Sequence, residues 1–427
     1  MHDHPITAWL KRSNALSFTL YGSVVAFCAY CCIFSLRKTF GVATYDGLSY
    51  WGVHYKVLMI TFQVIGYLIS KFAGIKVVSE MKANYRTRGI LIMTSIATIS
   101  WLFFAITPAP YNLIFLFFNG LPLGMVWSLI FGYLEGRKNT EVLGASLSVS
   151  FIFSGGFGKT VGGLVMRDWG VSEFWMPFIS AVMFFVPLLL FLWLIDKLPP
   201  PSAEDEAART KRQPMSGSDR MAFVRTFGPG LFLLIVSYAL LTAYRELRDN
   251  FSREIWNSLG YGDKPEIFTQ TEATVSIVVL VAIGSLMFIR NNRKAMVINH
   301  FMVVFGMVLS GLSTWLFQQG MLSPPVWMTL VGMGLYFGYI QFNSVFFDRL
   351  LAAFKYAGTV AFLINLADSC GYVGSVAVTF YKNFGQANLS WLEFFISTSY
   401  VLSVAGTLFM IISLVYFQRK HKVWTQT

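Results

Sequence analysis

Twelve apolar segments, each long enough to cross a bilayer, constrain this chain more than any other feature. A helix of about 20 apolar residues spans the roughly 30 Å hydrocarbon core of a membrane. The composition agrees: 55% of the residues are hydrophobic and only 13% are charged, whereas soluble domains carry about 25% charged residues. We therefore predict an all-α integral membrane protein, and exclude an ordinary soluble enzyme and a disordered chain. The expected spans are residues 15–45, 53–74, 89–108, 112–135, 144–165, 174–195, 228–252, 272–289, 296–318, 324–348, 356–381 and 391–417.

The net charge of +12 is divided unevenly between the two ends of these spans. Lysines and arginines gather before the first span and after the even-numbered spans, whereas the opposite side carries only Arg167, Arg253, Lys264 and Lys382. By the positive-inside rule, both termini are expected in the cytoplasm, with the chain in a plasma (bacterial inner) membrane. The basic charge is thus typical of a cytoplasmic membrane face, and we expect no nucleic-acid partner.

Two halves of six spans follow from a linker and an internal repeat. Residues 196–227 contain Pro199-Pro200-Pro201 and form the expected cytoplasmic linker between bundles 1–195 and 228–427. The pattern L-R-x-x-F occurs at Leu36–Phe40 and again at Leu247–Phe251. Three glycine pairs share one offset of 214 residues (334 − 120), namely Gly120 with Gly334, Gly124 with Gly338 and Gly144 with Gly358. Two parallel six-helix repeats predict the major facilitator architecture, whose substrate site lies between the halves near the membrane midplane.

Charged residues inside the spans are the first candidates for that site. An ionisable side chain within a span costs at least about 2.5 kcal/mol, so it is expected to have a function. Arg37 is expected in the outer part of a long first helix, as a site residue or a snorkelling anchor, and Lys38 is expected to be the anchor. Arg245, Glu246, Arg248 and Asp249 fall within two turns of the seventh span.

Two alternatives stay open for this charged group. Arg245 and Asp249 are i,i+4 neighbours that could neutralise each other and leave Arg248 for a ligand. All four residues could instead form an internal charge network. Two facing arginines, Arg37 and Arg248, would suit phosphate or carboxylate, because guanidinium groups bind such oxygens bidentately and stay charged.

Other polar and aromatic residues in the spans have both a functional and a packing interpretation. Lys71 could reach the cavity or face cytoplasmic water, and Lys159, among glycines expected to allow close helix packing, needs a partner or a cavity. Asp368, near Asn365, could neutralise a buried cation or carry protons during transport. Tyr30 and Trp127 could line the cavity or pack within the bundle. The scattered histidines and the cysteines in apolar runs predict no metal site, and no cofactor is expected.

The motifs around these residues resemble those of the organophosphate:phosphate antiporter branch of the major facilitator superfamily. The resemblance lies in Leu36–Phe40, in Ser70-Lys71-Phe72, and in Asn119-Gly120 with Gly124 and Trp127. It implies that Arg37 binds phosphate, that Lys71 faces the cavity, and that Arg248, or Arg245, is the second phosphate-binding arginine. Ser154 stands where the family has a substrate-binding histidine, and Glu80-Met81 replaces the Asp-Arg pair of the loop after the second span.

The leading hypothesis is a secondary active transporter, monomeric in the bilayer, that moves a small anionic solute, phosphorylated or carboxylated, by alternating access. Exchange against inorganic phosphate follows from the resemblance, and proton coupling through Asp368 is the competing version. A membrane ligand sensor or scaffold on the same fold, which binds without transport, is the alternative from another class. An integral-membrane enzyme is disfavoured, because the chain lacks H-E-x-x-H and G-x-S-x-G patterns.

Overall fold

The computed structural model describes residues 4–81, 83–137, 139–202, 205, 217–286, 288–356 and 360–424. Within them, eleven helices are long and apolar enough to cross a membrane, and a twelfth span results if the bent pair of α13 and α14 is counted as one. The expectation of an all-α membrane protein is confirmed. The helices of the first part are α1 (Pro5–Arg12), α2 (Ala15–Lys38), η1 (Thr39–Val42), α3 (Tyr55–Glu80), η2 (Ala83–Tyr85), α4 (Arg86–Ile106), α5 (Leu113–Leu134), α6 (Thr140–Trp169) and α7 (Met176–Ile195).

The second part of the chain continues the helical pattern. Its elements are α9 (Gly217–Asn250), α10 (Ser252–Ser258), α11 (Glu266–Leu286), α12 (Asn292–Gln318), α13 (Pro324–Ser344), α14 (Phe346–Ala353), α15 (Val360–Gly385), α16 (Trp391–Val401), the π turn η3 (Leu402–Gly406) and α17 (Thr407–Trp424). The described strands, β1 (Ser49–Tyr50) and β2 (Val53–His54), form a short antiparallel hairpin between η1 and α3.

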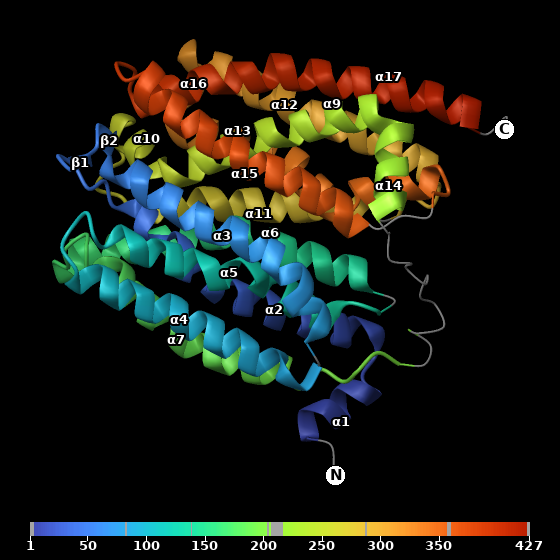
Figure 1. Ribbon diagram of the computed structural model, residues 1–427, viewed down its shortest axis with the longest axis horizontal. Coiled ribbons are helices and arrows are strands. Elements are labelled where there is room, and N and C mark those ends of the chain that lie inside the picture. Colours follow the sequence, from blue (N-terminus) through green and yellow to red (C-terminus); the bar gives the residue numbers. More distant parts are fainter. Residues whose placement is uncertain are drawn as a thin grey trace. The chain divides into compact units, whose positions relative to one another are not determined.

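The chain divides into two compact units. Unit 1 contains Met1–Arg209 together with Asn250–Ser276, and unit 2 contains Thr210–Asp249 together with Ile277–Thr427. The boundary therefore falls in α9 after Asp249 and in α11 after Ser276, so that the last residue of α9, all of α10 and the first half of α11 belong to unit 1. In unit 1, the β hairpin and α10 lie at one end and α1 lies at the other (Figure 1).

Glycines set the closest helix approaches in each unit. In unit 1, α3 packs along α5, and a Cβ on Gly120 would lie 2.1 Å from the carbonyl oxygen of Gln63. In unit 2, a Cβ on the repeat-related Gly334 would lie 2.4 Å from the carbonyl oxygen of Gly306 on α12. The matching glycines thus serve the same purpose, backbone contact between helices, but against different neighbouring helices.

The boundaries of two elements differ from the sequence expectation. The first helix was expected to run to residue 45, but α2 ends at Lys38 and continues as a 3-10 turn to Val42. The chain leaves the helix there because Tyr45 has a positive φ of 52°, and the Glu173 carboxylate accepts hydrogen bonds from the backbone N–H groups of Thr44 and Tyr45. Helix α9 begins at Gly217, inside the segment expected as linker. Linker residues 203–204 and 206–216 and the repeat residue Gly358 lie outside the described residues.

Candidate functional site

One tyrosine ring brings together two of the predicted site residues of unit 1. Arg37 lies in the last turn of α2 and is only 4% exposed. Its guanidinium carbon lies 3.8 Å from the centroid of the Tyr67 ring on α3. The amino group of Lys71 lies 5.5 Å from the centroid of the same ring. A desolvated cation–π contact, as for the buried Arg37, is worth about 2 kcal/mol. Lys71 is half-buried, and its amino group lies within cation–π distance of the same ring.

Sequence reasoning missed Tyr67, although a usable signal was present. Tyr67 and Lys71 are i,i+4 neighbours, and residues at that spacing share one face of a helix. An aromatic residue one turn before a candidate lysine could therefore have been added to the site. The part that could not be foreseen is that Arg37 lies over the same ring, because this depends on how α2 and α3 pack.

Side chains from three other helices hold the backbone at Arg37. The Leu36 carbonyl accepts hydrogen bonds from Trp101 Nε1 at 2.6 Å and Asn119 Nδ2 at 3.3 Å. The Arg37 carbonyl accepts one from Gln63 Nε2 at 2.9 Å, which also donates to Asn119 Oδ1 at 2.8 Å. Carbonyls at a helix C-terminus have no intrahelical partner, so these side chains satisfy them in a buried site. The conformation at Arg37 is therefore defined by its surroundings.

The expectation that Lys38 is a snorkelling anchor is wrong. Lys38 is 3% exposed, and its amino group donates a hydrogen bond of 2.8 Å to Asn250 Oδ1. The residues lie 212 positions apart in the chain, and both belong to unit 1. Helical periodicity places Lys38 and Arg37 on different faces of the helix. It does not indicate that a polar side chain covers the face that carries Lys38.

Helix α6 carries the two other polar candidates of unit 1. Lys159 is buried, with only 4% of its surface exposed. Ser154 is fully buried, its hydroxyl donates to the carbonyl of Ser150 one turn earlier, and it also lies within hydrogen-bonding reach of Cys31 on α2. The α6 glycines pack closely, as expected: a Cβ on Gly158 would lie 3.0 Å from the hydroxyls of Ser35 and Thr39.

The two aromatic candidates of unit 1 have ring neighbours. Tyr30 is buried, and its ring centroid lies 6.2 Å from that of Phe34. Trp127 is half-buried and stacks on Phe131, with centroids 5.2 Å apart.

In unit 2, a buried arginine lies among tyrosines. Arg245 on α9 forms an ion pair with Glu246, where a pair with Asp249 was one expectation, and both side chains are buried. The Arg245 guanidinium carbon lies 4.4 Å from the centroid of Tyr339 on α13. One of its nitrogens also donates to the Tyr372 hydroxyl of α15 at 3.3 Å. Three helices of unit 2 thus converge on one guanidinium group.

Asp368 belongs to the same aromatic group. The Tyr238 hydroxyl donates a hydrogen bond to Asp368 Oδ1, and Asn343 Nδ2 donates to that hydroxyl at 3.0 Å. Tyr238 stacks on Tyr339, with centroids 5.3 Å apart. Asp368 and Arg245 are therefore linked through two stacked tyrosines, which sequence reasoning did not single out.

The remaining candidates of unit 2 are Arg248, Asp249 and Asn365. Arg248 is buried and donates a hydrogen bond of 3.1 Å to the Met328 carbonyl on α13. Asp249 and Asn365 are half-buried, and the Asn365 carbonyl accepts from the Ser369 hydroxyl at 2.8 Å. Across the part of the chain that the structure describes, no three His, Cys, Asp or Glu side chains are grouped as metal ligands would be.

Comparison with solved structures identifies the class of fold. A D-xylose–proton symporter matches with a TM-score of 0.57 and 15% identity, over 95% of this chain and 97% of the other. A point mutant of the nucleoside transporter NupG matches with a TM-score of 0.59 and 13% identity, over 93% and 99%. A point mutant of the peptide transporter POT, in complex with sulfate, matches with 0.59 and 14%, over 94% of each chain. The chain therefore has the major facilitator fold.

The family follows from the sequence itself. Residues 39–420 match the model of a family described as a family of unknown function, DUF5690, and the chain belongs to this family. No curated protein has a significantly similar sequence. The family model covers both halves of the chain and most of the residues discussed above.

Proposed function

We propose that the protein is a secondary active transporter that moves a small anionic solute by alternating access. The observation that carries this proposal is that each unit buries an arginine over a tyrosine ring, Arg37 over Tyr67 in unit 1 and Arg245 over Tyr339 in unit 2. Buried guanidinium groups in membrane-spanning helices are costly and mark solute pathways. The three similar structures, whose names give a symporter and two transporters, support transport as the activity.

We infer that Arg245 is the arginine of unit 2 that meets the solute. The rings of Tyr339 and Tyr372 lie near the Arg245 guanidinium group, and Tyr238 stacks on Tyr339. Arg248, by contrast, donates a hydrogen bond from its guanidinium group to the Met328 carbonyl of α13. In this proposal Arg248 positions α9 against α13, and Arg245 supplies the bidentate fork that suits phosphate or carboxylate oxygens.

Glu246 has a specific consequence in this proposal. The Glu246 carboxylate is already paired with Arg245, so a solute anion would have to compete with this carboxylate for the guanidinium group. A bound solute then releases Glu246, which couples occupancy of the site to a rearrangement on α9. Proton coupling is the competing version, because Asp368 is buried and bonded to Tyr238.

The test is anion exchange in proteoliposomes. Vesicles preloaded with phosphate, a hexose phosphate or a dicarboxylate are supplied with the labelled form of the same anion. We expect wild type to exchange at least one of them, and Arg37→Lys and Arg245→Lys to lose at least about tenfold in rate, because lysine keeps the charge and loses the fork. Arg293→Lys, at an exposed arginine, is the matched control and should exchange at the wild-type rate.

Two other results would redirect the proposal. If folded, reconstituted wild type exchanges none of these anions, anionic transport is wrong. If exchange proceeds only with an imposed pH gradient and Asp368→Asn abolishes it, coupling is to protons and Asp368 is the carrier.

A further inference from the structure

A buried ion pair joins α3 to α10 inside unit 1. Lys56, the second residue of α3, is fully buried, and its amino group lies 2.6 Å from Glu254 Oε1 of α10, a side chain that is 15% exposed. The amino group also donates to the Gly41 carbonyl of η1 at 3.0 Å. Glu254 Oε2 is buried and has no hydrogen-bond partner among the described residues. Removing one partner of such a pair leaves an uncompensated charge in a buried place.

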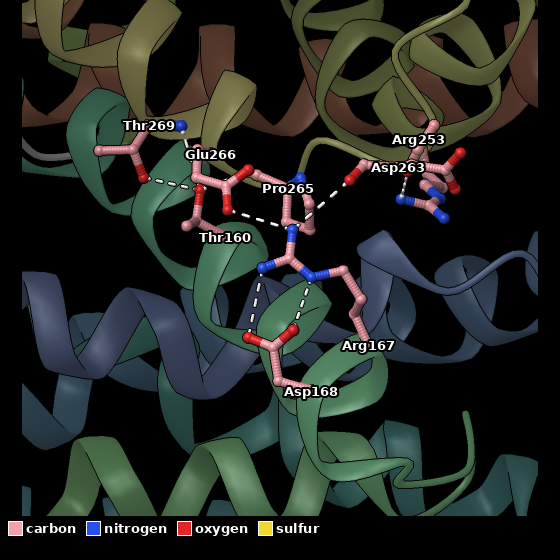
Figure 2. A network of polar contacts seen from close by, with 9 residues as sticks. Thr160, Arg167, Asp168, Arg253, Asp263, Pro265, Glu266 and Thr269 are labelled. Carbon is pink, nitrogen blue, oxygen red and sulfur yellow. Dashed lines mark hydrogen bonds and ion pairs between the residues drawn. The ribbon is translucent and has the colours of Figure 1, made fainter.

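A second set of contacts joins α6 to the start of α11. The Thr160 hydroxyl donates to the Pro265 carbonyl at 2.7 Å, and it lies 2.7 Å from the Thr269 hydroxyl, as Figure 2 shows. It also accepts the Thr269 backbone N–H at 3.2 Å. Thr160 therefore serves as a side-chain partner for the first turn of α11, whose N–H groups lack intrahelical acceptors.

Glycines of α6 let α11 approach closely at the same place. A Cβ on Gly156 would lie 2.3 Å from the Phe268 carbonyl oxygen, and one on Gly163 would lie 2.7 Å from Pro265 Cβ. The face of α6 that meets α11 is therefore smooth. Because these positions carry no side chain, the α11 backbone lies directly against α6, and few large side chains would have to repack if the segment moved.

A third contact lies at the surface. Arg167, near the end of α6, pairs with Asp168 and reaches Glu266 Oε1 of α11 at 3.2 Å (Figure 2). The Arg167 and Glu266 side chains are 42% and 47% exposed. An exposed pair of this kind contributes little to stability, so the buried Lys56–Glu254 pair is the stronger electrostatic contact of the docked segment.

The docked segment is continuous with unit 2 at both of its ends. Residues 250–276 pack with unit 1, but α9 up to Asp249 and α11 from Ile277 belong to unit 2. We propose that residues 250–276 form a reversible latch on α3 and α6, and that the Lys56–Glu254 pair is the contact that keeps it closed. This inference goes beyond the proposed function, because it assigns the docking step to particular residues whatever the solute is.

The latch can be tested by disulfide formation within unit 1. Thr160→Cys with Thr269→Cys places two thiols where two hydroxyls are hydrogen-bonded at 2.7 Å. The two side chains therefore meet, and the sulfurs need to move together by less than about 1 Å to form the S–S bond of about 2.05 Å. Oxidised glutathione is added as the oxidant, and it is reduced to two glutathione thiols as the two cysteine thiols form the disulfide. The rate of this reaction, followed by mass spectrometry of the linked peptides, reports how much of the time the latch is closed. The native cysteines are the same in every variant and affect all of them equally.

Three variants of the double-cysteine protein separate the proposal from a general loss of structure. Glu254→Gln leaves Lys56 uncompensated and should slow disulfide formation about tenfold. Lys56→Met combined with Glu254→Leu removes both charges and should restore the parental rate, because well-packed apolar residues can replace a buried ion pair. Glu266→Gln, in the exposed pair, is the matched control and should leave the rate unchanged.

The outcomes are decisive in both directions. Slow oxidation in Glu254→Gln with recovery in the double replacement supports the latch. An unchanged rate in Glu254→Gln, or a double replacement as slow as the single one, overturns it. If Glu254→Gln does not fold, Glu254→Asp, which keeps the charge on a shorter side chain, takes its place and must also oxidise more slowly. No solute enters this experiment, so failure of the anion-exchange test leaves its interpretation intact.

Discussion

At the scale of single residues, the features that sequence reasoning missed are mostly neutral aromatic side chains. Charged residues in apolar spans are conspicuous because they are costly there, and Arg37, Lys159, Arg245 and Asp368 are indeed buried. A tyrosine among many aromatic residues has no such signal. Tyr67 is recognised as a site residue only from the structure, in which Arg37 lies over its ring.

The Tyr67 contact gives a prediction that separates its ring from its hydroxyl. Tyr67→Phe keeps the aromatic surface under Arg37 and should leave anion exchange within about twofold of wild type. Tyr67→Leu removes that surface and should lower the rate about thirtyfold, since a desolvated cation–π contact is worth about 2 kcal/mol. Both rates are measured in the same proteoliposome assay. A loss of equal size in Tyr67→Phe would show that the hydroxyl, and not the ring, supports Arg37.

At the scale of helices, the apolar segments predicted the spans well, and their ends less well. A hydrophobic run reports where a helix can cross a membrane, but the end of α2 depends on Glu173 far along the chain, which binds the backbone at Thr44 and Tyr45. Likewise, Lys38 was expected to be an interfacial anchor because its partner, Asn250, comes from a distant segment of the chain. Periodicity shows which face of a helix is apolar, and it does not show which neighbour covers a polar position.

The glycine contacts give a prediction at this scale. Gly120→Ala should destabilise the protein by about 1–3 kcal/mol, a typical cost of overpacking, because the added Cβ would lie 2.1 Å from the Gln63 carbonyl oxygen. Gly284→Ala is the matched control, since that glycine has no neighbouring atom within 4 Å of an added Cβ, and alanine there should stabilise α11 by up to about 1 kcal/mol. Thermal unfolding in detergent compares the two. Equal melting temperatures would show that α3 and α5 can separate freely.

At the scale of the whole molecule, the internal repeat was sufficient to predict the fold. The L-R-x-x-F motifs and the glycine pairs indicated two related halves, and the similar structures confirm the major facilitator fold. The resemblance to organophosphate antiporters remains a prediction about the solute, because the family that the chain belongs to is described without a function. How the first turns of α11 pack with unit 1 was not foreseeable, because the repeat assigns that segment to the second half.

The central claim, that the protein binds a small anion through the guanidinium groups of Arg37 and Arg245, is tested most directly by binding measurements on arginine variants. The dissociation constant of the anion that wild type exchanges fastest is measured by calorimetry for wild type, Arg37→Lys, Arg245→Lys and the double variant. If these guanidinium groups bind the anion, each single variant should bind at least about tenfold more weakly than wild type, because lysine keeps the charge and loses the fork, and the double variant should bind no more tightly than either. A dissociation constant within about twofold of wild type in Arg37→Lys or in Arg245→Lys would contradict the claim.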